Sequence, residues 1–305
     1  MTREIAVVGA PSNIGIRPYE DGEPRHLNRA PEVLRRRDLI ARLGAIDFGD
    51  VMPPPYRDYA KPVERARNEA QVAAYSRLLA ARVGAAMRGG RFALVIGGDC
   101  SIVLGCLLGA RRRAGGPVGL TYVDAHADFA TPHESPTGSV SGMSLALASG
   151  RGDSPLAALG GRSPLVNGRR VALLGRRDGL SAHGHPALAA SSILDVPTHQ
   201  FLSHAANDLA AAALARVLPS GTRGFWIHLD VDVLDAAVMS AVDSPTRGGL
   251  MPDQLVQLLT PLVQHPQALG LDVSIYDPAL DPDRSCARRL VNLLAAVFDE
   301  RDREA

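Results

Sequence analysis

The sequence predicts an α/β protein with three layers, in which helices cover both faces of a parallel sheet of about eight strands. Short apolar, β-branched runs such as residues 92–96 and 118–123 alternate with longer stretches of helical periodicity. The runs are apolar on both faces, as buried parallel strands are. No linker-like composition interrupts the 305 residues, so we expect a single domain over residues 1–305.

The N-terminal half alternates strands with helices. Apolar runs predict strands at residues 5–9, 45–48, 92–96 and 118–123. Periodic stretches predict helices at residues 31–43, 62–87, 101–113 and 141–148. Pro31 and Pro62 are expected to open the first two helices, and Gly44 and Gly89 to end them.

The C-terminal half repeats the alternation. Strands are predicted at residues 169–174, 193–196, 225–229 and 269–276. Helices are predicted at residues 203–218, 252–263 and from Asp283 or Ser285 to residue 298. We expect Ser203 to cap the first of these helices and Pro252 to open the second.

The amino-acid composition indicates which kinds of binding partner to expect. Lys and Arg number 33 and Asp and Glu 32, so no bias towards nucleic acid is visible. No uninterrupted apolar run has membrane-spanning length, and three cysteines give no disulfide framework. These features favour a cytoplasmic protein without a membrane or nucleic-acid partner.

Ligand-type side chains gather at the predicted ends of three strands. Asp124, His126 and Asp128 follow residues 118–123 at a spacing of two, so an extended chain would direct them to one side. Asp230 and Asp232 follow residues 225–229 in the same way, and Gly97-Gly98-Asp99-Cys100-Ser101 follows residues 92–96. In open parallel sheets, ligands bind outside the carboxyl ends of the strands. A metal site is favoured over solvated polar residues at strand ends.

The sequences GGDCS at 97–101, DAHAD at 124–128 and DVDVLDA at 230–236 resemble the ureohydrolase family of arginases, agmatinases and related amidinohydrolases. The resemblance extends from Ala10-Pro11-Ser12 to Asp277-Pro278. It implies an arginase-like fold, a homo-oligomer (trimer or hexamer) and a centre of two divalent ions, most often Mn²⁺. The implied metal ligands are Cys100, Asp124, His126, Asp128, Asp230 and Asp232.

Cys100 departs from the family, which has a histidine at this position. A thiolate is a softer ligand, so Zn²⁺, Fe²⁺ or Co²⁺ become possible beside Mn²⁺. One branch of the family, acting on Nω-hydroxy-L-arginine in antibiotic biosynthesis, also carries Cys here. The alternative is a bystander thiol.

The resemblance also implies catalytic and substrate-binding roles. Asp128 would transfer protons, and Ser141 stands where arginases have a proton-shuttling histidine. Ile275 stands where arginases have a glutamate that pairs with the guanidinium, and Asp272 is the nearest carboxylate able to replace it through a shifted or bulged strand. The implied substrate-binding residues are Thr137, Ser139 and Asp178.

Two further departures argue against L-arginine as the substrate. Ala130 and Leu180 stand where arginases have polar groups that hold the amino-acid end. His183 and His185, in the same loop as Leu180, are expected to be surface residues rather than ligands.

We therefore expect a binuclear metal-dependent hydrolase that cleaves a C–N bond of a guanidino compound other than arginine, releasing urea or a substituted urea. An Nω-hydroxy-L-arginine-type amidinohydrolase is the nearest alternative. Alternatives of other classes are a catalytically silent ureohydrolase-like oligomer and a single-metal amide hydrolase.

Overall fold

All eight strands belong to one parallel sheet in the computed structural model, which describes residues 3–159, 161, 164–178 and 186–299. The strand order is β2-β1-β3-β8-β7-β4-β5-β6. The strands are β1 (Ile5–Gly9), β2 (Ile46–Asp50), β3 (Phe92–Ile96), β4 (Gly119–Val123), β5 (Val171–Leu174), β6 (Leu194–Val196), β7 (Phe225–Asp230) and β8 (Ala268–Ser274). The predicted α/β class and strand number are confirmed.

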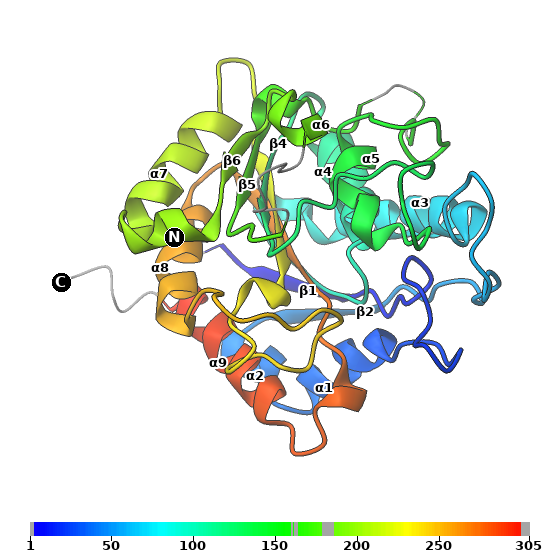
Figure 1. Cartoon of the computed structure of the whole chain (residues 1–305). Coiled ribbons are helices and arrows are strands. Elements are labelled where there is room, and N and C mark those ends of the chain that lie inside the picture. The colour runs from blue at the N-terminus through cyan, green and yellow to red at the C-terminus, as the bar shows by residue number, and fades with distance from the viewer. Residues whose placement is uncertain (1–2, 160, 162–163, 179–185, 300–305) are drawn as a thin grey trace.

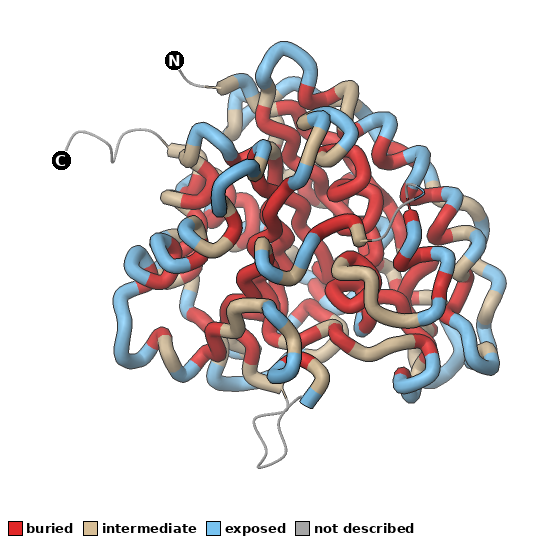
Figure 2. Tube along the Cα trace, turned by 90° about the horizontal axis from the view of Figure 1, so that it is seen from above, coloured by how far each residue is buried: buried red, intermediate tan, exposed pale blue. Residues whose placement is uncertain are grey.

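Helices cover both faces of the sheet, as Figure 1 shows. One apolar core joins the sheet to α1 (Ala30–Arg35), α2 (Leu39–Leu43), α7 (Ala206–Val217), α8 (Pro252–Gln264) and α9 (Ser285–Phe298). The other joins it to α3 (Glu69–Ala86), α4 (Ile102–Ala114), α5 (Ser144–Ala148) and the short α6 (Pro186–Ala189). In Figure 2 the buried chain forms the centre and the exposed chain the rim. The three predicted layers are therefore present.

The four central strands, β3, β8, β7 and β4, matter most for function. β3, β4 and β7 are buried along their whole length, as their predominantly apolar sequences predict. The segments that carry the ligand-type residues follow directly from the ends of these three strands. Because the four strands are parallel neighbours, their carboxyl ends meet at one edge.

Two predicted helices have different boundaries in the structure. Residues 31–43 form α1 and α2 rather than one helix, because Asp38 adopts a left-handed conformation with φ of 62°. The helix expected from Pro62 begins only at Glu69. Asn68, with φ of 47°, accepts hydrogen bonds from the amides of Arg57 and Asp58 through its side chain, which fixes the preceding segment as a loop.

Some helix termini also differ from expectation. Ser203 does not cap α7, whose first residue follows Ala205; the Ser203 hydroxyl bonds to the carbonyl of Gln200 instead. Residues 141–148 divide into a 3₁₀ turn, Ser141–Met143, and α5. None of the described helices combines the length and apolar character needed to cross a lipid bilayer.

Candidate metal centre

A cleft of about 310 Å³ opens at the carboxyl ends of the central strands. Its walls carry most of the residues that the sequence singled out. The lining includes Cys100, His126, Asp128, Ala130, Thr137, Ser139, Ser141, Asp178, Asp230, Asp232, Asp243 and Ile275. The structure thus brings together segments that lie far apart in the sequence, from Ile16 to Ile275, as the parallel topology predicts.

The segment after β4 turns so that its histidine faces two carboxylates. The His126 amide donates to Asp124 Oδ1 at 2.6 Å, closing a tight turn. The His126 ring Nδ1 lies 2.9 Å from Asp232 Oδ2 and 3.5 Å from Asp124 Oδ1. Asp124 is fully buried, whereas the His126 side chain is 30% exposed. This part of the centre therefore faces the cleft mouth.

The two carboxylates after β7 are held by backbone amides. Asp230 Oδ1 accepts from the Asp232 amide at 2.8 Å, and Asp232 Oδ1 accepts from the Ala125 amide at 3.3 Å. Arg177 stabilises the turn from the other side, donating to the carbonyls of Asp232 at 2.6 Å and Val233 at 3.1 Å. The positions of these side chains are thus fixed by the fold before any ligand binds.

Asp128 lies among hydroxyl groups and is partly exposed to the cleft. Its Oδ2 accepts from the Tyr122 hydroxyl at 2.6 Å and from the Ser144 hydroxyl at 3.2 Å. Its backbone φ of 46° is unusual for a residue other than glycine, and such conformations concentrate at functional sites. The hydroxyl groups orient the carboxylate within the cleft lining.

Cys100 reaches the centre from a turn that only glycine permits. A Cβ on Gly98 would lie 1.9 Å from the carbonyl oxygen of Ser12, so no larger residue fits between the two segments. The Cys100 Sγ lies 3.0 Å from Asp230 Oδ2, and the residue as a whole is 2% exposed. Burial, together with the charge of Asp230, raises the pKa of the thiol well above its usual value. Without a cation the thiol donates to the carboxylate.

The carboxylates repel one another because they are buried close together. Burial, and then the charge of Asp232, raise the pKa of Asp124 to about 7. The pKa values of Asp128 and Asp230 are also raised well above the usual range, first by burial and then by neighbouring carboxylates. Carboxylates in this arrangement need a positive charge to remain ionised together.

Two groups of ligand-type atoms meet the geometric demand of a metal site. Asp124, His126 and Asp232 form what we call the outer group, and Cys100, Asp124 and His228 the inner group; within each, the ligand atoms lie within 4.8 Å of one another. Asp124 belongs to both, and its Oδ2 is buried without a hydrogen-bond partner among the described residues. An orphaned carboxylate oxygen between two groups fits a divalent cation well.

The residues predicted to bind substrate line the cleft. Ser139 Oγ accepts from the Arg17 amide at 2.9 Å, and the Ser139 amide donates to Thr137 Oγ1 at 3.2 Å. Asp178 Oδ2 accepts from the Ala127 amide at 3.1 Å, next to the metal-ligand segment. Ser141 donates to Asp99 Oδ1 at 3.4 Å. Their roles towards a substrate stay predictions, and Leu180, His183 and His185 lie outside the described residues.

Asp272 does not reach the cleft. It is fully buried, with one oxygen 2.6 Å from Trp226 Nε1 and the other 2.6 Å from His228 Nδ1. The register of β8 with β3 and β7 is regular at this residue, so no bulge moves it towards the substrate. The expectation that Asp272 replaces the glutamate of arginases does not fit this placement, because Asp272 lies two residues before the end of β8 and both of its oxygens are hydrogen-bonded in the core.

Ile275, the position where the resemblance implies a glutamate in arginases, lines the cleft. Its φ of 70° is strained for a β-branched side chain, and β8 ends at Ser274, two residues earlier than predicted. Sequence reasoning also missed Asp243, another carboxylate of the lining, whose Oδ1 lies 2.5 Å from Arg25 Nη2. No motif marks Asp243, because its contact depends on how the loop after β7 folds.

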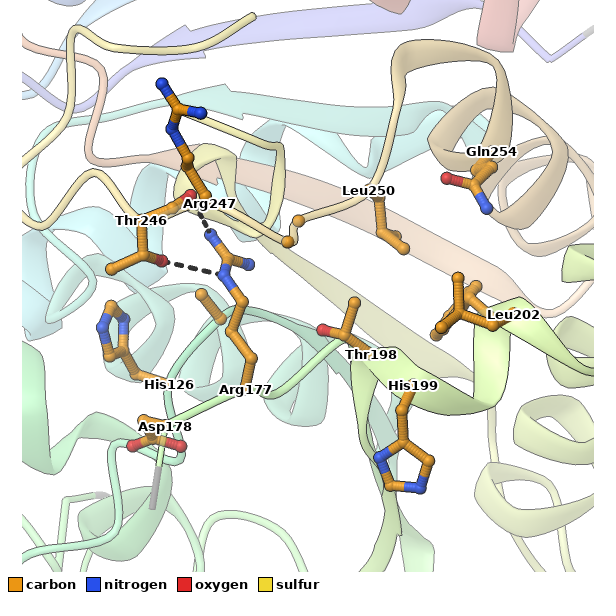
Figure 3. A pocket seen from close by; sticks show the side chains of 14 residues that line it. His126, Arg177, Asp178, Thr198, His199, Leu202, Thr246, Arg247, Leu250 and Gln254 are labelled. Carbon is orange, nitrogen blue, oxygen red and sulfur yellow. Dashed lines mark hydrogen bonds between the residues drawn. The ribbon is translucent and has the colours of Figure 1, made fainter. Parts of the chain in front are cut away.

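A neighbouring pocket of about 480 Å³ lies on the other side of His126 (Figure 3). Arg177 crosses it and donates to Thr246 Oγ1 at 2.8 Å. Leu202 and Leu250 give its far end an apolar character, as Figure 3 shows. His126 and Asp178 line both cavities, so the pocket adjoins the outer group.

Known protein families and sequences include relatives that match this chain over nearly its whole length. A sequence model of the Arginase family matches residues 3–298. An arginase from Brevibacillus brevis is 29% identical, with 99% of both chains covered.

Solved structures share the fold. The arginase of Bacillus caldovelox superposes with a TM-score of 0.86 at 28% identity, covering 98% of this chain and 99% of that one. Proclavaminate amidino hydrolase from Streptomyces clavuligerus gives a TM-score of 0.73 at 17% identity, covering 97% and 91%. The second similarity concerns the fold alone.

Proposed function

The chain belongs to the arginase family, and from this premise we propose that it hydrolyses a C–N bond of a guanidino compound with two divalent metal ions. The observation that carries the proposal is the cluster of three buried carboxylates beside His126, formed by Asp124, Asp230 and Asp232, with the partly exposed Asp128 in the same cleft. Buried carboxylates without counter-charges are costly, so their presence at a cleft supports a cation-binding role.

The outer group and the inner group would hold one ion each, with the two oxygens of Asp124 available to both. Bound there, the ions would supply Lewis acidity and a hydroxide nucleophile near neutral pH. Carboxylate and imidazole favour Mn²⁺ and similar ions, whereas the thiol of Cys100 favours Zn²⁺, Fe²⁺ or Co²⁺. The resident metal is therefore proposed as Mn²⁺ or one of these softer ions.

Asp128 is the residue we assign to proton transfer. It would take the proton of the attacking nucleophile and return it to the departing nitrogen, so that the products are an amine and a urea. The hydroxyls of Tyr122 and Ser144 hold one carboxylate oxygen in place during this exchange. Ser141 does not titrate near neutrality and is hydrogen-bonded to Asp99, so we assign it a positioning role at the cleft wall.

The cleft favours a weakly basic guanidine over a fully charged one. Ile275 offers an apolar surface where a guanidinium would need a carboxylate, and Asp243 is already paired with Arg25. Ala130 likewise offers no polar group to an α-amino acid. A hydroxyguanidine is less basic than a guanidine, so the Ile275 position favours a hydroxyguanidine, whereas Ala130 disfavours an α-amino-acid end, including that of the alternative substrate Nω-hydroxy-L-arginine. L-Arginine is proposed to be a poor substrate.

The test is a substrate panel with urea release as the readout, before and after metal removal with EDTA. The panel contains L-arginine, agmatine, 4-guanidinobutyrate and Nω-hydroxy-L-arginine. Unpaired polar groups cost about 1–3 kcal/mol each, so we expect kcat/KM for L-arginine at least about tenfold below the best substrate. L-Arginine as the best substrate would refute this preference. Retained metal with no urea from any compound would support a catalytically silent protein.

A variant pair at Ile275 sharpens the panel. Ile275→Glu should raise kcat/KM for agmatine and L-arginine selectively, because it supplies the missing carboxylate. Ile275→Leu is the matched control, since it relieves the β-branched strain without adding charge. An equal effect of both variants would show that strain, rather than charge, governs the cleft.

Assembly and compartment are proposed from the family alone. A homo-oligomer, trimer or hexamer, in the cytoplasm is the expectation. Size-exclusion chromatography with light scattering tests the assembly.

A further inference from the structure

Resting on the proposed two-metal function, we propose that His228 is a metal ligand and supplies from β7 the imidazole that Cys100 replaces at the end of β3. His228 precedes Asp230 by two residues, so both side chains leave the same face of the strand. His228 is fully buried, and its ring lies close to Cys100 and Asp124. The sequence motifs of the strand ends do not include it.

The ring of His228 is held in one orientation. Its Nδ1 lies 2.6 Å from Asp272 Oδ2, and the other Asp272 oxygen accepts from Trp226 Nε1 at 2.6 Å. The ring also stacks on Tyr122, with centroids 4.2 Å apart and planes inclined by 29°. A carboxylate only accepts hydrogen bonds, so Nδ1 carries the proton and Nε2 keeps its lone pair. Carboxylates orient metal-ligating histidines in this way.

The remaining nitrogen has no partner among the described residues. His228 Nε2 is buried and without a hydrogen bond, as is Asp124 Oδ2. An unpaired buried acceptor costs free energy, and here two of them occur near the same buried thiol. The ligand atoms of Cys100, Asp124 and His228 lie within 4.8 Å of one another. One cation at the inner group would satisfy both orphaned atoms.

The alternative is a core histidine whose only function is packing. That role accounts for the stacking on Tyr122 and the bond to Asp272. It does not account for an unsatisfied Nε2 that shares a cluster with Cys100 and Asp124. The inner group would therefore contain sulfur, oxygen and imidazole nitrogen, a set that favours Zn²⁺, Fe²⁺ or Co²⁺ over Mn²⁺.

The first test uses the unaltered protein. X-ray absorption spectroscopy of the fully Zn²⁺-loaded chain should show imidazole scattering from two histidines and one sulfur for two ions, with the sulfur about 2.3 Å from zinc. Two ions with a single coordinated imidazole would overturn the role of His228 alone. A wild-type chain that retains no ion after dialysis would contradict the proposed function itself, so the two failures are distinguishable.

A variant pair provides the second test. His228→Gln should lose one coordinated imidazole. Calorimetry should show that the affinity of the inner group for its ion falls at least tenfold, while the outer group binds its ion as in wild type. His199→Gln is the matched control, because His199 is exposed in the neighbouring pocket. Circular dichroism in EDTA establishes that both variants fold. Unchanged affinity for both ions in folded His228→Gln would overturn the proposal.

Discussion

The outer and inner groups share Asp124 but differ in the origin of their other ligands. In the outer group, His126 and Asp232 come from the two motifs DAHAD and DVDVLDA, which are recognisable in the sequence. The His126 side chain is 30% exposed. The inner group is buried and departs from the family at Cys100. Cys100 at the end of β3 lies near His228 of β7, whose Nε2 has no hydrogen-bond partner among the described residues. Under the proposed ligand set, the inner group is therefore defined by proximity in space and not by position in a motif.

Removing the shared ligand should have the largest effect. Asp124→Ala is expected to reduce bound metal from two ions to fewer than one per chain and to abolish urea release, because both groups lose the same carboxylate. Elemental analysis after dialysis measures this. Asp153→Ala, at an exposed position, serves as the control. Two ions retained by Asp124→Ala would contradict the shared role.

Removing the thiol should affect one group only. Cys100→Ala is expected to retain about one ion, held by the outer group, whereas Cys100→His should raise the affinity of the inner group for Mn²⁺. Cys106→Ala is the control, since it removes another buried thiol outside both groups. Calorimetric titration with Mn²⁺ and Zn²⁺ distinguishes the variants. Metal binding by Cys100→Ala at wild-type levels would show that Cys100 is a bystander.

The pH dependence of stability should reverse when metal is removed. Burial, followed by the charge of Asp232, raises the pKa of Asp124 to about 7, whereas a carboxyl of an unfolded chain titrates near pH 4. Between about pH 4 and pH 7, Asp124 is therefore protonated in the metal-free folded state but not in the unfolded state. The free energy of unfolding of the metal-free protein should fall by up to about 4 kcal/mol as the pH rises through this range. Divalent ions need the carboxylate, so they should stabilise the chain most at the upper end of this range.

Thermal melting in EDTA and in Mn²⁺, measured from about pH 5 to pH 7.5, checks this expectation. Asp124→Asn should remove most of the decline in EDTA because the amide does not titrate. A melting temperature that rises over this range in EDTA would show that the carboxylates are not under mutual repulsion.

The smallest expected effect concerns the outer group alone. Arg177 donates to the backbone carbonyls of Asp232 and Val233 in the turn after β7. Arg177→Gln should therefore loosen this turn and lower the affinity of the outer group for its ion by roughly tenfold. The inner ion should be unaffected. Arg247→Gln is the control, because Arg247 is exposed in the same pocket (Figure 3). Equal weakening of both ions would remove the distinction between the groups.

The sequence predicts much of the fold and the outer group, for identifiable reasons. Apolar runs reveal the buried strands, and the motif after β4 correctly places Asp124 and His126 together at a strand end, although a tight turn and not an extended chain brings them together. The breaks at Asp38 and Asn68 were not predicted, because they depend on left-handed backbone conformations.

The expectation for Asp272, which its placement does not fit, and the omission of His228 have a common cause. Both residues lie within apolar strands, where a polar side chain gives no sign of which partner it meets across the sheet. The register of β7 and β8 pairs His228 with Asp272, and that register becomes known only from the fold. Period-two alternation from Asp230 would have placed His228 on the metal-facing side.

The most direct test of the central claim is a crystal structure of the Zn²⁺-loaded protein with anomalous scattering at the zinc edge. We predict two peaks that share Asp124, with the inner peak about 2.3 Å from Cys100 Sγ and about 2.1 Å from His228 Nε2. A single peak at the outer group, or an inner peak more than about 3 Å from both the sulfur and the nitrogen, would contradict it.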